Sequence, residues 1–455
     1  MRGLVALSLA ALAGCGTLPT LVPEMAPHSS RAVQIDGARG PLSARQSRVI
    51  LAGLKKRGAE TSIFDRHLAV EEGIVGTPLV AGNKVVLLQD GPATFKAMFN
   101  AIRHAKDHIH METYIIEDDE VGKKFAEELI ARQAQGVHVT LIYDSVGSIN
   151  TSKDFFKRLV EGGAKTLEFN PINPLTAKKG WQVNQRDHRK LLIIDGRIAF
   201  LGGINISSVY SGGSFSHSSK RRPGGNPPWR DTHLQVEGPV VAEFQRLFLA
   251  TWDKQKGEPL APRSSFPQLS NQGKEVMRAI GSSPDEPYSL IYATLISAIQ
   301  SAETSVHLTN AYFVPDPQLL AALTDAAQRG VDVRIILPSN TDFWLVFHAG
   351  RSYYAKLLVA GVKIYERRDV LLHSKTALID GVWSTIGSTN LDWRSFLHND
   401  EVNAVILGQE FGAQMAAMFN ADLAASDAIT LESWTRRPLG NRVKEITARL
   451  WEYWL

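Results

Sequence analysis

The chain has very little cysteine: Cys15 is the only one among 455 residues, which excludes a disulfide within the chain. It also lacks a strong excess of charge, because 50 basic and 46 acidic residues leave a formal net charge of +4. That balance does not favour nucleic acid as a partner, since nucleic-acid-binding proteins concentrate basic residues. No uninterrupted apolar run reaches the length of about 18 residues that a membrane-spanning helix needs, so we expect no transmembrane helix.

The first residues have the pattern of an export signal. One positive charge at Arg2 precedes an apolar segment, and Leu12-Ala13-Gly14-Cys15 follows. This pattern resembles a bacterial lipoprotein signal over residues 1–15, which implies that Cys15 is lipidated and anchors the protein to a membrane on its extracytoplasmic side. Gly16 favours the outer membrane over the inner one. A plain secretory signal with an incidental cysteine is the alternative, and we expect residues 16–42 to form a flexible tether.

A motif is duplicated in the chain. His188 to Gly196 and His373 to Gly381 both read H-x-K-x4-D-G. The match continues beyond the motif, because Asn205 and Asn390 follow their respective histidines at the same spacing. Gly203 and Ser388 also occupy equivalent positions, two places before each asparagine. The duplication predicts two related halves that each contribute one His-Lys-Asn set to a shared phosphate site.

Strand and helix patterns alternate in both halves. Apolar runs led by Gly136 and Gly330 are typical of buried strands, and segments with helical spacing separate such runs. We therefore predict an α/β fold of two tandem α/β/α sandwich domains, residues 43–262 and 270–455, packed as a pseudo-twofold dimer within one chain. Residues 211–229 interrupt the first half with a Gly/Ser/Pro-rich insertion that carries Lys220, Arg221 and Arg222.

Each motif is expected to form a hairpin. Lys190–Ile194 and Arg197–Leu201 flank an Asp-Gly turn, and the second copy repeats the pattern. Side chains alternate along a strand, so His188 and Lys190 share a face, as do His373 and Lys375. Asp195 and Asp380 lie roughly 16 Å along an extended strand from their histidines, too far for a hydrogen bond. We assign these two aspartates a structural role.

Two histidines on one phosphate can divide a displacement reaction between them. A neutral imidazole can attack phosphorus while the other, protonated, supplies a proton to the leaving oxygen. Lysine and asparagine donors would stabilise the non-bridging oxygens. Each histidine also needs an acceptor on its other nitrogen, and the candidates are Asp231, which follows His188 in the first half, and Glu401, which follows His373 in the second. The predicted site comprises His188, Lys190, Asn205, Asp231, His373, Lys375, Ser388, Asn390 and Glu401.

Other chemistries have weaker support. His108 and His110 share a strand face, but no cysteine or carboxylate cluster accompanies them, so we predict no metal. Neither a phosphate-binding P-loop nor a dinucleotide fingerprint is present, and we predict no cofactor.

The duplicated motif resembles that of the phospholipase D superfamily, and the chain is most similar to bacterial cardiolipin synthases of the phospholipase D type. That resemblance implies two α/β/α units, a phosphohistidine intermediate and no metal. It implies His188 as nucleophile, His373 as acid and base, and Asp231 and Glu401 as the histidine-orienting carboxylates. Gly203 departs from the serine found at position 388. The strings that carry the resemblance are Arg186–Gly196, Gly202–Ile206, Trp229–Pro239, Ala311–Asp316, Arg351–Tyr354, Leu371–Thr376 and Ile386–Ser395.

The resemblance implies a phosphatidyltransferase that makes cardiolipin from two phospholipids, with phosphatidylglycerol as acceptor. Phosphatidylethanolamine is a further candidate substrate, and the membrane is the expected partner. A hydrolytic phospholipase D that releases phosphatidic acid is the main alternative. A nuclease and a catalytically inactive binding lipoprotein are less consistent with the charge balance and the intact motifs. Residues 343–347 and 450–455 are aromatic-rich segments that either contact the membrane or pack in the core.

Overall fold

The computed structural model describes residues 33–57, 61–173, 182, 184–212, 227–260 and 265–454. The predicted signal peptide with Cys15, most of the predicted tether and the Lys220–Arg222 cluster lie outside these residues. Within the described part of the chain, no helix is both long enough and apolar enough to cross a membrane.

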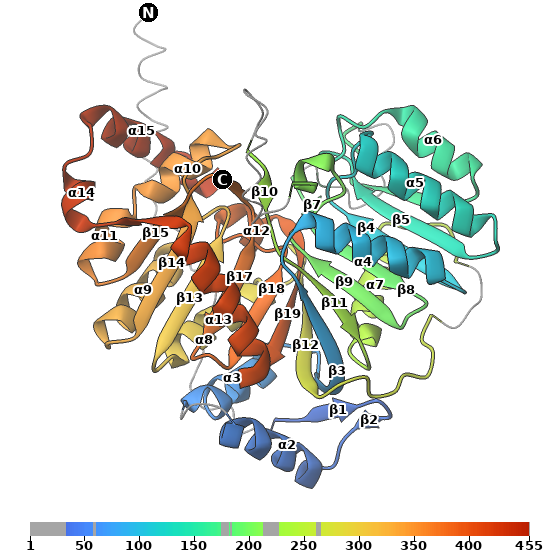
Figure 1. The fold of residues 1–455 in the computed structure, drawn as a ribbon, viewed down its shortest axis with the longest axis horizontal. Helices are drawn as coiled ribbons and strands as arrows, with labels where there is room; N and C mark the ends of the chain where they lie inside the picture. The colour runs from blue at the N-terminus through green and yellow to red at the C-terminus, as the bar shows by residue number, and fades with distance from the viewer. Residues whose placement is uncertain are drawn as a thin grey trace, which may run out of the picture.

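Most strands belong to one continuous sheet, whose two halves, here called the first and second sheets, have the same strand order and the same pairing pattern (Figure 1). In each sheet the first five strands pair antiparallel, and the next two join in parallel. The first sheet runs β3 (Leu79–Leu88), β11 (His233–Glu237), β9 (Ile198–Gly202), β8 (Lys190–Ile194), β4 (His108–Thr113), β5 (His138–Asp144) and β6 (Lys165–Phe169). The second runs β12 (Glu275–Ser282), β19 (Asn399–Leu407), β18 (Trp383–Gly387), β17 (Lys375–Ile379), β13 (Ser305–Asn310), β14 (Asp332–Pro338) and β15 (Lys363–Arg367), and then adds antiparallel β20 (Ser426–Ile429).

The two sheets meet at one antiparallel strand pair. β3 pairs with β12, with Val80 opposite Met277, and these are equivalent strands of the two repeats. The pseudo-twofold axis therefore passes between β3 and β12. This arrangement confirms the predicted α/β fold with two related halves.

Helices cover both sheets and follow the repeat. Their first turns are capped by side chains of the types that favour helix starts, such as Asp90, Asp119, Ser289 and Asp316. The first half contributes α4 (Gly91–His104), α5 (Glu120–Gln133), α6 (Lys153–Glu161) and α7 (Val241–Lys254). The second contributes α8 (Leu290–Ser301), α9 (Pro317–Gln328), α10 (Trp344–Arg351), α11 (Tyr354–Val359), α12 (Trp393–Leu397), α13 (Gln409–Ala424), α14 (Leu431–Thr435) and α15 (Leu439–Arg449).

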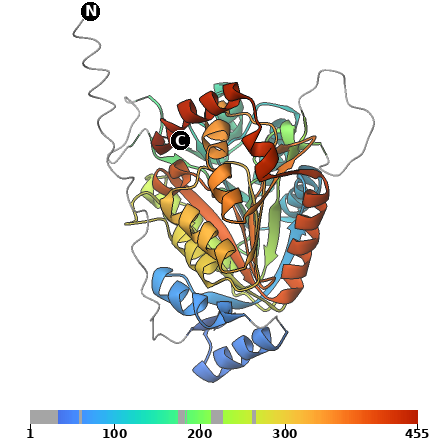
Figure 2. The same cartoon turned by 90° about the vertical axis from the view of Figure 1, so that its left-hand side faces the viewer.

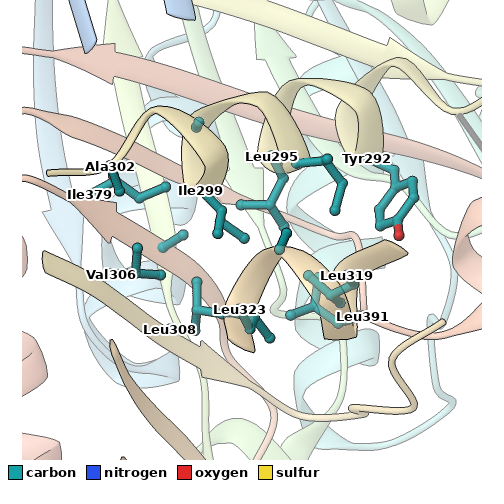
Figure 3. Packing of buried hydrophobic residues seen from close by; sticks show 14 of the residues in the cluster. Tyr292, Leu295, Ile299, Ala302, Val306, Leu308, Leu319, Leu323, Ile379 and Leu391 are labelled. Atoms are coloured by element: carbon teal, nitrogen blue, oxygen red, sulfur yellow. The ribbon is translucent and has the colours of Figure 1, made fainter. Parts of the chain in front are cut away.

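The central strands are buried on both faces. Along β8, Leu191 and Ile193 pack in a core shared by both halves, whereas Leu192 and Ile194 pack under α4 and α5. The sequence of β8 is therefore a nearly continuous apolar run, because successive side chains of the strand point into different cores. In the second half, α8 and α9 pack over β13 and β17 in the same way (Figure 3).

The first described residues pair with a strand of the first half and pack in the core of the second half, where we had expected a tether and the start of the first domain. We expected a flexible tether through residue 42, but β1 (Ile35–Gly37) pairs with β3, and β2 (Gly40–Pro41) pairs with β1. We also assigned residues 43–75 to the first domain. In the structure α3 (His67–Ile74) lies against α8, and Nδ1 of His67 lies 3.0 Å from the Ser297 hydroxyl. Apolar side chains on this segment bury themselves in the core of the second half, which the sequence pattern did not reveal.

Figures 1 and 2 show that α2 (Ala44–Arg57) lies at one end of the molecule. The short strands β7 (Arg186–Asp187) and β10 (Trp229–Arg230) lie toward the opposite end, as does α15.

Candidate functional site

Short strands from the two halves cross at the pseudo-twofold axis. β7 (Arg186–Asp187) leads to the first motif and pairs in parallel with the start of β19. Its equivalent β16 (Leu371–Leu372) leads to the second motif and pairs in parallel with β10 (Trp229–Arg230). The backbone N–H of His188 donates to the Asp400 carbonyl at 2.9 Å, and that of His373 donates to the Arg230 carbonyl at 2.7 Å. Each motif histidine is therefore fixed by the backbone of the other half.

This crossing exchanges the orienting carboxylates between the halves. Nδ1 of His188 lies 3.0 Å from the Glu401 carboxylate, and Nδ1 of His373 lies 2.7 Å from that of Asp231. Sequence position had grouped them within each half, Asp231 with His188 and Glu401 with His373. The structure corrects that grouping, because Asp231, which follows β10, and Glu401, near the start of β19, each lie beside the histidine of the opposite half. With Nδ1–H donating to a carboxylate, Nε2 of each imidazole keeps its lone pair for chemistry.

Burial and charge set the protonation of these four groups. Burial lowers the pKa of His188 to about 4, although Glu401 opposes that shift. Burial also lowers the pKa of His373, with a further contribution from Lys375. Burial alone would raise the pKa of Glu401, but His188 and Lys190 lower it to about 2. The free site therefore holds an ionised Glu401 beside a neutral His188, the form in which an imidazole can attack phosphorus.

The two lysines are buried among these groups. The ammonium of Lys190 donates to the backbone carbonyl of His188, and that of Lys375 donates to the carbonyl of His373. Burial lowers the pKa of Lys190 to about 7 and that of Lys375 to about 8. The carboxylates of Glu401 and Asp231 influence both lysines, although each carboxylate bonds only one histidine. The charged groups of both halves therefore share one electrostatic site.

The asparagines have different surroundings in the two halves. The Asn205 amide donates to the Tyr210 hydroxyl at 3.1 Å and accepts from the backbone N–H of Ile115 at 3.2 Å. In the described structure the buried Oδ1 of Asn390 has no hydrogen-bond partner. The two asparagines predicted to bind phosphate therefore differ in hydrogen bonding, because Oδ1 of Asn205 has a partner and Oδ1 of Asn390 has none among the described residues.

Gly203 and Ser388 account for a further asymmetry. The Ser388 hydroxyl donates to Glu401 at 2.5 Å. A Cβ at Gly203 would lie 2.3 and 2.5 Å from the carboxylate oxygens of Asp231, so no side chain fits there. Glycine is required at 203 by the close approach of Asp231, whereas Ser388 fills the equivalent space beside Glu401.

The motif aspartates lie at the other end of each hairpin. Asp195 and Asp380 have positive φ angles of 54° and 49° in the turns that follow β8 and β17. The Asp195 carboxylate accepts backbone N–H groups of residues 106–108, and that of Asp380 accepts those of residues 303–305. These bonds fasten each hairpin turn to the start of the neighbouring strand, away from the histidines.

Sequence reasoning did not assign a role to several aromatic residues around the histidines. The Tyr114 ring lies 5.0 Å from the His188 ring and 5.1 Å from the Lys190 nitrogen. The Tyr210 hydroxyl lies 3.3 Å from Nδ1 of His373, and the Trp229 ring lies 5.0 Å from that imidazole. For Tyr114 the sequence offers its position, because it directly follows a strand. In the structure the last residue of that strand pairs with Lys190.

The alternative metal residues lie in an ordinary core environment. Nδ1 of His110 lies 2.7 Å from the Gln245 amide, and its ring stacks on Phe248 at 4.6 Å. His108 bonds its neighbour Asp107. Across the described ranges, no group of three or more potential metal-ligating side chains comes together.

The duplicated fold and the two histidine–lysine motifs define a protein of the phospholipase D-like class. A family model described as "Cardiolipin synthase, PLD-like domain" matches residues 98–211 and 295–423. The chain is 38% identical over 377 residues to a cardiolipin synthase of Geobacillus sp. (strain WCH70), which covers 82% of this chain and 73% of that protein. It is 37% identical over 366 residues to cardiolipin synthase 2 of Bacillus anthracis, covering 80% and 69% respectively. The chain belongs to the cardiolipin synthase family.

A solved structure supports the fold at greater distance. The phosphatidylserine synthase of Haemophilus influenzae Rd KW20 superposes with a TM-score of 0.63 at 14% identity, covering 85% of this chain and 99% of that one. At this identity the likeness concerns the fold alone.

Proposed function

We propose that this phospholipase D-type phosphatidyltransferase makes cardiolipin from two ready-made phospholipids, with phosphatidylglycerol as acceptor. The observation that supports the proposal most directly is the exchanged pair of carboxylates. Each holds one buried imidazole through Nδ1, and together they bring the reactive groups of both halves into one site. The relatives named cardiolipin synthase supply the substrate class.

The first step transfers a phosphatidyl group to His188. Its Nε2 lone pair attacks the phosphorus of the donor lipid, and the bond from phosphorus to the head-group oxygen breaks. His373, protonated, gives its proton to that oxygen, so the head group leaves as a neutral alcohol. The products are a phosphatidyl-histidine at 188 and a neutral His373.

The second step reverses these roles. Neutral His373 accepts the proton of a glycerol hydroxyl of phosphatidylglycerol, and the oxygen attacks phosphorus while the bond to His188 breaks. Lys190, Lys375, Asn205 and Asn390 supply donors for the non-bridging oxygens in both steps. One phosphodiester replaces another, so the exchange needs no nucleotide.

The site of action follows from the predicted lipoprotein signal. A lipidated Cys15 would place the enzyme on the extracytoplasmic side, where exchange between existing phospholipids needs no nucleotide-activated donor. The same signal supports the outer membrane as the location. Mass spectrometry of the mature N-terminus tests this part, because acylated Cys15 should be its first residue, and Cys15→Ser should release the protein from the membrane fraction.

One product assay tests the reaction. The purified chain is incubated with phosphatidylglycerol alone, and cardiolipin with free glycerol in equal amounts is the expected result. Added phosphatidylethanolamine, with release of ethanolamine, tests the second donor. Phosphatidic acid without cardiolipin would overturn transfer in favour of hydrolysis, and degradation of plasmid DNA would favour a nuclease. His188→Ala and His373→Ala are the matched inactive controls.

A further inference from the structure

We propose that α15 and residues 450–453 dock the enzyme on a bilayer that contains anionic phospholipid. The inference rests on the proposed function and deepens it, because it names the surface through which lipid substrates approach the site. Four properties of this surface carry the proposal: an exposed apolar stripe, adjoining exposed aromatic residues, a cationic flank and proximity to His373.

The apolar stripe consists of Leu439, Val443, Ile446 and Leu450. Their spacing of four, three and four residues places them along one side of the helix. All four are exposed, with 62 to 75% of each residue accessible. The residues that α15 buries are Glu445 and Ala448. A helix in a soluble protein normally turns its apolar side inward, so this helix presents its apolar side to a partner.

Exposed aromatic residues adjoin the stripe. Trp451 follows it directly and is 56% exposed. The helix α10 packs against α15. Its first residue Trp344 and the preceding Phe343 are 45 and 44% exposed. Tryptophan at the edge of an apolar surface is typical of the membrane interface, where one part of the ring is apolar and the other is hydrated.

The charges beside the stripe have one dominant sign. Residues 431–454 contain five basic and three acidic side chains. Two of the three acids, Glu445 and Glu452, are buried, and Glu445 pairs with Arg437. The exposed cations are Lys444, Arg436, which pairs with the exposed Glu432, and Arg449, which lies 3.5 Å from Glu452. An apolar stripe with a cationic flank fits an anionic lipid surface. A second copy of this chain fits less well, because a symmetric contact would bring two cationic flanks together.

The surface lies close to the second motif. The Tyr453 ring is 5.6 Å from the ring of Trp393, which begins the helix that follows Asn390. On the other side, Asp342 precedes Phe343 and accepts the hydroxyl of Tyr312, whose ring lies 6.0 Å from His373. Figure 1 shows α15 and α10 at the end of the molecule where β10 lies. A bilayer bound there would present head groups on the same side as His373.

Vesicle binding tests the proposal without requiring turnover. Full-length chains that all carry Cys15→Ser, so that no acyl anchor contributes, are sedimented with vesicles of phosphatidylglycerol and phosphatidylethanolamine or of phosphatidylcholine alone. The stripe variant is Val443→Ser/Ile446→Ser/Leu450→Ser. The matched control is Val49→Ser/Val160→Ser/Val359→Ser, three exposed aliphatic residues on other helices. Thermal unfolding checks that both variants fold, and turnover of short-chain phosphatidylglycerol dispersed below its micelle concentration is measured alongside.

We expect the stripe variant to bind the phosphatidylglycerol vesicles about tenfold more weakly or worse, because three apolar side chains no longer enter the interface. The control should stay within about twofold of the parent, and both variants should turn over dispersed substrate like the parent. Equal binding by stripe variant and control would overturn the proposal, as would a stripe variant that binds vesicles normally but loses self-association. If the parent makes no cardiolipin yet the stripe still governs vesicle binding, the proposed function fails and the docking surface stands.

Discussion

Glu401 of the second half lies 3.0 Å from Nδ1 of His188 in the first half, and Asp231 of the first half lies 2.7 Å from Nδ1 of His373 in the second. Neither half therefore contains both members of a histidine–carboxylate pair. The pseudo-twofold axis that joins the repeats also brings each histidine to the carboxylate of the other half. A separated half would hold a histidine without its carboxylate.

The exchanged carboxylates can be tested separately. We expect Glu401→Gln and Asp231→Asn each to lower kcat about a thousandfold, because an amide no longer holds the histidine in its reactive tautomer. A donor lipid with a good leaving group, such as a nitrophenyl ester, needs no proton from His373 in the first step. The first-turnover burst of nitrophenolate should then recover largely in Asp231→Asn, where later turnovers still need His373 as the base, and should stay low in Glu401→Gln.

Glu432→Gln, an exposed carboxylate on α14, serves as the control and should behave like the parent. Recovery in Glu401→Gln instead of Asp231→Asn would reverse the assigned roles of the two histidines.

The sequence predicted the local elements, such as the motif hairpins, but it did not predict the features that depend on contacts between the halves. The H-x-K-x4-D-G copies predicted both hairpins, because a strand, an Asp-Gly turn and a second strand are specified by neighbouring residues. The pairing of His188 with Glu401 depends on β7 meeting β19, a contact between segments far apart in the chain. No local pattern encodes that pairing. The packing of α3 on α8 was missed for the same reason.

Gly203 and Ser388 offer a test of the asymmetry between the halves. Gly203→Ala would place a Cβ within 2.5 Å of both carboxylate oxygens of Asp231 and displace them from His373. We expect a loss of about a hundredfold or more in kcat, since catalysis is sensitive to small misplacement. Ser388→Ala removes one hydrogen bond to Glu401 and should cost about tenfold. Steady-state kinetics on both variants measures whether kcat falls more in Gly203→Ala than in Ser388→Ala. A larger fall of kcat in Ser388→Ala would contradict the prediction.

The pH dependence should follow His373 and the buried lysines. The first step needs the His373 proton, and burial lowers the pKa of His373, so the decline of kcat/KM should begin where that proton is lost. Lys190 and Lys375, with pKa values of about 7 and about 8, lose their charge above those values, and we expect kcat/KM to fall further there because the phosphate then meets neutral amines. On the acid side, His188 stays neutral until pH approaches its pKa of about 4, so nucleophilic attack should persist to about pH 5. The profile is measured with a phosphodiester, which does not itself titrate in this range. A plateau extending to about pH 10 would show that the lysines titrate normally.

Arg189, between His188 and Lys190, links the two halves through a buried guanidinium. It donates to the Glu401 carbonyl at 3.1 Å and to the Thr251 hydroxyl at 2.7 Å, and lies 3.7 Å from the carboxylates of both Glu112 and Asp400. Arg189→Met would leave Glu112 without its cation and Asp400 with Lys254 alone, 3.5 Å away, and we expect it to lower the free energy of unfolding by about 3–5 kcal/mol.

Ser374 occupies the equivalent position in the second motif, where its hydroxyl meets only neutral partners, including Thr232 at 3.2 Å. Ser374→Ala should therefore cost only about 1 kcal/mol. Urea unfolding of the two variants measures the contrast. Equal stability would mean that the carboxylates around Arg189 bind protons when the guanidinium is lost, and the stability of Arg189→Met would then fall as the pH rises, because ionising those carboxyls favours the unfolded chain.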